Sequence, residues 1–238
     1  MGSYSAYRPS LQWPPHCCSS APESQDNDGP CASTCPSSRC LFRPPVVHLV
    51  AMKIDMPLFA APLAQDVVTF WIDAGPAQWF AKHGDFDRRF REHFLDTHLA
   101  AARRELDDWL STSYGTLALL LMTDQFPRNA FRGTAHMYAT DALARQFAMH
   151  AYEHGQMARV ERPLRLFFCL PFAHSEDPAD QRISVELNGR LGQPWLAHAI
   201  RHRDIVMRFG RFPHRNPLLG RETTRAEARF LAEGGFAG

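Results

Sequence analysis

Apolar residues recur every three or four positions from about residue 64 to the end of the chain. This spacing is typical of amphipathic helices, whereas a half-buried strand would alternate every second residue. Glycine and proline separate the apolar segments, as expected at helix ends. No two alternating segments flank a hairpin turn. The pattern therefore predicts an all-α fold of antiparallel helix pairs, arranged either as a tetratricopeptide-like superhelix or as a compact bundle.

Several helix positions follow from local signals. Leu117 to Met122 is apolar on nearly all sides, which predicts a central, buried helix. Pro127 predicts that this helix ends or kinks near Phe126, because the residue before a proline disfavours the helical region. Pro171 is expected to stop the helix that runs through "PLRLFFCL". Thr224 and Glu227 have the spacing of a capping box, which predicts the start of the last helix.

The first 51 residues have a different composition from the rest. They are rich in proline and serine and contain five of the six cysteines, Cys17, Cys18, Cys31, Cys35 and Cys40. Such a segment has too few apolar residues to offset the entropy of ordering, so we expect disorder. The regular apolar pattern begins near Met52. This suggests that residues 1–51 are an upstream extension, included because the start codon was chosen too early. Residues 52–238 are then expected to form a single all-helical domain.

Overall composition narrows the function classes. Of the 238 residues, 45% are hydrophobic and 21% are charged, and the formal net charge is +1. This composition is typical of a globular protein. The net charge argues against a nucleic-acid partner, because binding to nucleic acid needs a strongly basic surface. The longest apolar helical run is far shorter than the roughly 20 residues of a membrane span. With no secretory signal in the sequence, we expect a cytoplasmic protein with no membrane partner.

Polar residues gather in three segments, 123–135, 171–182 and 202–221. Two of them contain a similar motif, "FPRN" at 126–129 and "FPHRN" at 212–216. Each motif is followed by a glycine that lies beside an arginine. A proline stops the helix, and an arginine follows at a turn where asparagine is favoured. The repetition suggests that both loops face one cavity and present guanidinium groups to an anion.

This interpretation predicts a pocket for a small anionic molecule or peptide. Its expected ligand-binding residues are Asp124, Arg128, Arg132, His174, Arg211, His214, Arg215 and Asn216. The structural alternative is that the arginines bond carbonyl groups at helix ends while the asparagines occupy turns. A second alternative for the whole domain is a helical-repeat scaffold that binds a peptide or protein in a concave groove.

The "HSED" sequence before Pro178 contains the candidate catalytic residues His174, Glu176 and Asp177. They could supply a general base with an acid, or metal ligands in a hydrolase that also uses His202. They could equally cap the helix that Pro178 opens. Segment 202–221 holds five arginines but only Asp204 as an acid, which favours an anion over a metal. We therefore expect neither a metal nor a cofactor.

The longest motifs are "LALLLMTDQFPRNAFRGTAHMYATD" at 117–141, "PFAHSEDPADQ" at 171–181 and "HRDIVMRFGRFPHRNPLLGR" at 202–221. With "FW" at 70–71, "WF" at 79–80 and "FD" at 86–87, they resemble an uncharacterised bacterial family, domain of unknown function 924. The resemblance runs from about residue 65 to the C-terminus. It implies an all-helical fold similar to tetratricopeptide-like superhelices, and it implies no established activity, substrate or cofactor.

Overall fold

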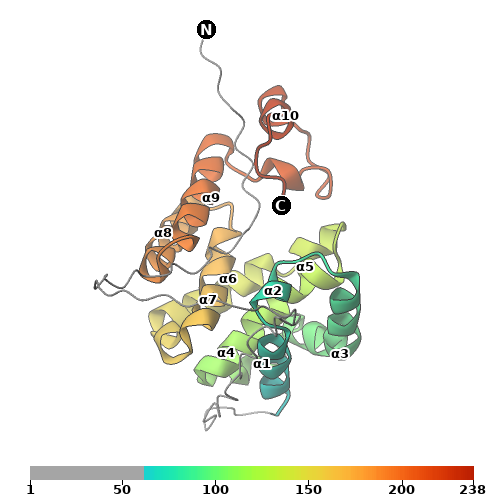
Figure 1. Cartoon of the computed structure of the whole chain (residues 1–238), viewed down its shortest axis with the longest axis vertical. Helices are drawn as coiled ribbons and strands as arrows, with labels where there is room; N and C mark the ends of the chain where they lie inside the picture. The colour runs from blue at the N-terminus through green and yellow to red at the C-terminus, as the bar shows by residue number, and fades with distance from the viewer. Residues whose placement is uncertain (1–61) are drawn as a thin grey trace, which may run out of the picture. The chain divides into compact units, whose positions relative to one another are not determined.

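All regular structure in the described part of the chain, residues 62–238, is helical, which confirms the all-α prediction. The structure is a computed structural model, and the predicted extension at residues 1–51 lies outside the residues it describes. In chain order the α-helices are α1 Pro62–Ala74, α2 Pro76–Trp79, α3 Gly84–Ala102, α4 Ser113–Leu120, α5 Phe126–Ala130, α6 Asp141–Glu153, α7 Leu166–Ala173, α8 Pro178–Leu191, α9 Trp195–Phe209 and α10 Arg225–Ala232 (Figure 1). The tetratricopeptide-like arrangement stays a prediction.

The main apolar core is built around α4. Every residue of α4 is buried, as the apolar run predicted, and the helix contacts α1, α6 and α7. Helix α3 contributes Phe86, Phe90 and Phe94, which follow one another at intervals of four and so share a face. Trp71 of α1 packs on Phe90 at 5.4 Å between ring centroids. This aromatic packing fixes the helices on which the polar segments are mounted.

The interruption predicted near Phe126 is a wide turn rather than an end. Residues Leu121–Gln125 form a π-helical turn in which the Phe126 N–H donates to the Leu121 carbonyl, and Phe126 itself stays helical. Pro127 has no N–H, so the chain cannot form the regular bond to the Thr123 carbonyl. A π turn of this kind absorbs the mismatch and is frequent at functional sites.

Side chains satisfy three successive carbonyl groups of this turn. The Met122 carbonyl accepts from Nδ1 of His98 at 2.8 Å, and the Thr123 carbonyl accepts from the Thr140 hydroxyl at 2.6 Å. The Asp124 carbonyl accepts from Arg128 at 2.8 Å. Buried carbonyl groups need such partners, so the irregular turn depends on these three side chains.

Replacement of Thr140 by valine is expected to lower the free energy of unfolding by about 1–3 kcal/mol, because the buried Thr123 carbonyl loses its donor. Chemical denaturation measures this change. Thr134 is the matched control, since its hydroxyl donates to the Phe131 carbonyl at an exposed site. Thr134→Val should cost clearly less, and equal costs for the two variants would contradict the role given to Thr140.

The prediction that Pro171 stops a helix is wrong. Helix α7 continues through Pro171 to Ala173. The end of this helix is held from outside, because the buried amide of Gln181 donates to the carbonyl groups of Phe172 at 3.2 Å, Ala173 at 3.0 Å and Ser175 at 2.6 Å. These bonds supply donors at the C-terminal turn, where α-helical carbonyls lack them. They also fix the position of His174, which follows directly.

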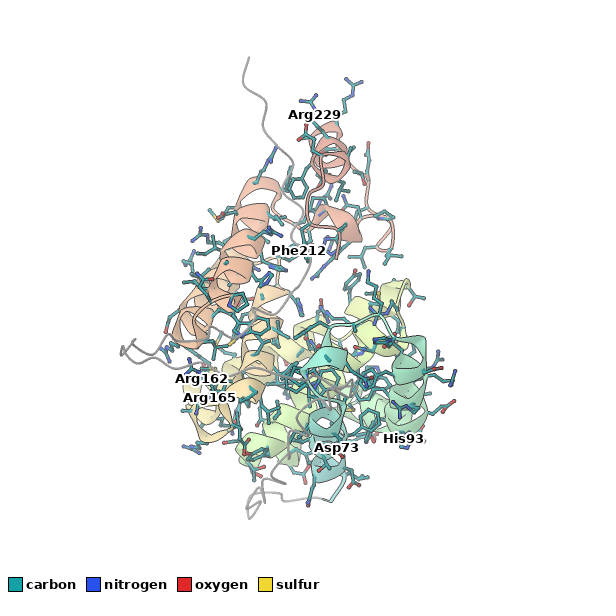
Figure 2. The ribbon with its side chains drawn as sticks, viewed as in Figure 1. Asp73, His93, Arg162, Arg165, Phe212 and Arg229 are labelled. Atoms are coloured by element: carbon teal, nitrogen blue, oxygen red, sulfur yellow. The ribbon has the colours of Figure 1, made fainter. Side chains whose placement is uncertain are left out.

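The C-terminal residues have a second, smaller apolar cluster. It consists of Ile205, Val206 and Phe212, with Phe209, Phe230 and Phe236 packed against them. Thr224 and Glu227 form the predicted capping box at the start of α10. In Figure 2, Phe212 lies in the interior of this region, whereas Arg229 of α10 lies at its outer edge. The candidate site adjoins this second cluster, since the guanidinium group of Arg215 lies 4.7 Å from the Phe212 ring centroid.

Candidate functional site

At the centre of the candidate site, the buried Asp124 pairs with the partly buried His174. Asp124 lies in the π turn and is 1% exposed. Its Oδ1 is 2.7 Å from Nδ1 of His174, which follows the last residue of α7. Its Oδ2 accepts from the Gln125 amide at 2.6 Å. A carboxylate in this position fixes the orientation of the imidazole ring, because Nδ1–H is the natural donor to it.

The charge states of this pair follow from its surroundings. Burial raises the pKa of Asp124, but the positive charge of Arg128 and the hydrogen bonds outweigh it, and the pKa falls well below its usual range. Burial lowers the pKa of His174, and Arg128 lowers it further against the opposing effect of Asp124. The pair is therefore an anionic carboxylate and a neutral imidazole, protonated on Nδ1. Nε2 then carries a lone pair, and within residues 62–238 it makes no hydrogen bond.

Arg128 and Arg215, one from each of the two similar motifs, meet at Asp141. Arg128 forms a bidentate pair with the Asp141 carboxylate, at 2.8 Å to Oδ1 and 3.1 Å to Oδ2. Arg215 reaches the same Oδ2 at 3.3 Å. Arg128 is also 3.2 Å from Oδ1 of Asp124. We call Asp124, Arg128, Asp141, His174 and Arg215 the Asp124 cluster.

Arg215 is the more confined of the two arginines in the Asp124 cluster. Only 7% of it is exposed, and its guanidinium group lies 4.7 Å from the ring centroids of both Tyr138 and Phe212. It donates to the backbone carbonyl of His174 at 2.9 Å. Burial lowers the pKa of Arg215, with Asp141 acting in the opposite direction. Its buried Nε has no hydrogen-bond partner within the described part of the chain.

The three catalytic candidates of the "HSED" sequence point in different directions. His174 bonds Asp124, whereas Glu176 forms two bonds of 2.8 Å with Arg221 and accepts the Phe212 N–H at 2.9 Å. Asp177 caps α8 by accepting the Ala179 N–H at 2.7 Å. Among residues 62–238, no group of three or more His, Cys, Asp or Glu side chains is placed to hold a metal ion. The geometry therefore gives the metal-dependent hydrolase no support.

Other predicted ligand-binding residues lie outside the Asp124 cluster. Arg132 pairs with Asp87 of α3 at 3.0 Å, and Arg211 pairs with Glu227 at 2.7 Å. Asn216 is fully buried beside Thr223. His214 packs against Phe236 at 5.1 Å between ring centroids. Burial and the charge of Arg215 lower the pKa of His214 to about 4, so it is a neutral neighbour of the cluster.

The three polar segments thus meet in space. His174 contacts Asp124 of the first segment and Arg215 of the third, and Glu176 contacts Arg221. The sequence did not identify Asp141 and Tyr138 as site residues. Asp141 is the first residue of α6, and an acidic side chain in the first turn of a helix is favoured for local reasons alone. The repeated motif was the signal in the sequence that could have led to Asp141, because two arginines that converge need an acidic side chain between them.

Comparisons with known proteins give a family but no activity. The model of a family described as "Bacterial protein of unknown function (DUF924)" matches residues 67–235. The solved structure of a protein of unknown function from Agrobacterium tumefaciens is 57% identical, with a TM-score of 0.71, over 72% of this chain and 98% of that one. A search of the curated proteins found no match. No helix within residues 62–238 has the length and apolar character needed to cross a membrane.

Proposed function

The chain belongs to the bacterial family of unknown function DUF924, and we propose that its Asp124 cluster binds a small anionic molecule beside a proton-accepting His174. The observation that carries the proposal is the orientation of His174. Its Nδ1 is held by a buried carboxylate at 2.7 Å, which leaves the lone pair of Nε2 for a ligand. Burial and Arg128 keep the pKa of His174 low, so this lone pair is present at neutral pH.

The arrangement suits proton transfer as well as binding. An imidazole that is oriented by a carboxylate through Nδ1 can take a proton on Nε2, and the carboxylate then stabilises the imidazolium that forms. Arg128 and Arg215 lie on either side of the same carboxyl group, Asp141, and offer positive charge in a largely water-excluded place. Electrostatic interactions with a ligand are stronger there than at the surface. The reaction class, if the protein is an enzyme, is general acid–base chemistry on an anionic substrate.

Anions are expected to stabilise the native protein. Inorganic phosphate, sulfate, acetate and citrate are the probes, and a thermal-shift titration measures the response. A probe present at a hundred times its Kd should add about 2.7 kcal/mol to the free energy of unfolding. The same addition should shift the ¹⁵N resonance of His174 Nε2, because the ligand lies beside that atom.

The matched control is Arg132→Ala. It removes the arginine that follows the first motif, beside its glycine, and leaves the Asp124 cluster intact. Arg128→Ala and Arg215→Ala should each lose most of the anion response, while Arg132→Ala keeps it. His174→Gln should retain binding of the anion and lose only the histidine signal. If none of the four probes stabilises the wild type, the proposal is refuted in favour of a structural role for both arginines.

A further inference from the structure

The place where Arg128 and Arg215 meet has three sources of positive charge and two carboxylates, Asp124 and Asp141. Two guanidinium groups reach it from residues that are far apart in sequence. The third source is the N-terminus of the 13-residue helix α6, whose first N–H groups are not bonded within the helix. Thr140, at the N-cap of α6, gives no side-chain capping bond, because its hydroxyl bonds the Thr123 carbonyl instead. Asp124 pairs with Arg128 alone, whereas Asp141 pairs with both arginines at the start of α6.

The geometry around Asp141 is that of a bound carboxylate ligand. Arg128 holds its two oxygens as a fork, at 2.8 and 3.1 Å, which is the favoured recognition of a planar carboxylate. Arg215 adds a longer bond of 3.3 Å, and its buried Nε has no partner within residues 62–238. Arg215 is therefore the weakly compensated arginine, with a donor left over on a side chain that is 8% exposed. A buried donor without a partner costs free energy, so this position favours a further acceptor.

We propose that Arg128, Arg215 and the N-terminus of α6 form a receptor for a carboxylate-type anion, which the protein's own Asp141 side chain occupies until a ligand displaces it. The inference rests on the proposed function, since it identifies the anion class and its competitor at the same site. Asp141 is the first residue of α6, and 18% of its side chain is exposed. A rotation of that side chain toward water removes the carboxylate from Arg215 and leaves Arg128 paired with Asp124.

The proposal has a mechanistic consequence. The Asp141 side chain competes with the ligand. The apparent affinity of the protein for the ligand is therefore reduced to the fraction of molecules in which Asp141 does not fill the site. It also keeps two buried arginines compensated when no ligand is bound, which a desolvated cation requires. His174 lies next to this receptor and can accept a proton on Nε2. The expected ligand therefore carries a carboxylate for the arginines and a proton-donating group for His174.

The test is the affinity of Asp141→Asn for acetate, citrate and inorganic phosphate, measured by calorimetry and compared with that of the wild type. We expect citrate or acetate to bind the variant at least about tenfold more tightly, because the competing charge has been removed. Phosphate should gain less, because a tetrahedral anion fits the planar fork less well. Asp141→Ser is the second variant, since serine is well accepted at a helix N-terminus. Circular dichroism with and without the anion reports whether each variant is folded.

Asp87→Asn is the matched control. Asp87 also lies in the first turn of a helix, α3, and it pairs with Arg132, which follows the first motif. Among residues 62–238, only this one arginine reaches it. This variant should gain no anion affinity. If Asp141→Asn and Asp141→Ser are folded and bind no anion more tightly than the wild type, the receptor proposal is overturned.

The two proposals fail in different ways. If the wild type responds to anions and Asp141→Asn binds them more weakly, the proposed function stands and Asp141 orients the arginines instead of competing. If only Asp141→Asn responds, the receptor stands, and the proposed function fails for the wild-type chain. A variant that folds only when the anion is present also supports the receptor, because the anion then replaces the missing carboxylate.

Discussion

Replacement of Asp124 by alanine is expected to lower the free energy of unfolding by about 3 kcal/mol, the lower end of the cost of removing one partner from a buried ion pair. Asp124 is 1% exposed and accepts from His174, Gln125 and Arg128. Its loss leaves two buried polar side chains without an acceptor. Arg128 keeps Asp141, so the cluster is weakened without the creation of a wholly unpaired charge. Equilibrium denaturation in urea at pH 7 measures the change.

Asp177→Ala is the comparison for this variant. Asp177 is an exposed N-cap that accepts one backbone N–H, so its loss should cost about 1 kcal/mol. Asp124→Asn keeps the volume and should fall between the two alanine variants. A cost for Asp124→Ala as small as that for Asp177→Ala would mean that the buried carboxylate contributes no net stability. The Asp124 cluster would then be retained for a reason other than folding.

The sequence predicted those elements whose causes are local. The burial of α4 follows from an apolar run, the capping box follows from Thr224 and Glu227, and both are confirmed. The course of the chain at the prolines was harder to predict. Pro127 is accommodated by a π turn whose carbonyl groups are bonded by distant side chains, among them His98 and Thr140. A proline rule that considers only neighbouring residues cannot include such partners.

The site shows the same division between local and distant causes. The convergence of the three polar segments was expected from the repeated motif, and the contacts of His174 bring it about. The different partners of Arg128 and Arg132 could not be predicted, because they depend on which helix faces each side chain. Arg128 faces the start of α6 and pairs with Asp141, whereas Arg132 faces the start of α3 and pairs with Asp87. An ion pair between residues far apart in sequence leaves little trace in either segment alone.

Neutral histidines make the fold sensitive to mild acid. His202 packs against Phe212 and Phe236 at 5.5 and 4.6 Å between ring centroids. Burial lowers its pKa to about 4, with smaller contributions from His174, His198 and Arg215. Burial, Arg215, His202 and His174 also lower the pKa of His214 to about 4, against the opposing charge of Glu176. Both side chains are neutral in the native state, whereas in the unfolded chain they take up protons near pH 6.5.

Stability is therefore expected to be fully present above about pH 6.5 and to be lost as the pH falls toward 4, because the unfolded state binds more protons over that range. A pKa lowered from 6.5 to about 4 corresponds to about 3 kcal/mol for each histidine when the loss is complete. The lowered pKa values of His174 and His198 act in the same direction. Urea denaturation at a series of pH values from 7.5 to 4.5 measures this slope. His202→Phe should reduce the slope, since phenylalanine keeps the ring packing and binds no proton, whereas His83→Gln at an exposed position should leave it unchanged. A free energy of unfolding that stays constant between pH 7 and 5 would contradict the assignment of neutral, buried histidines beside Arg215.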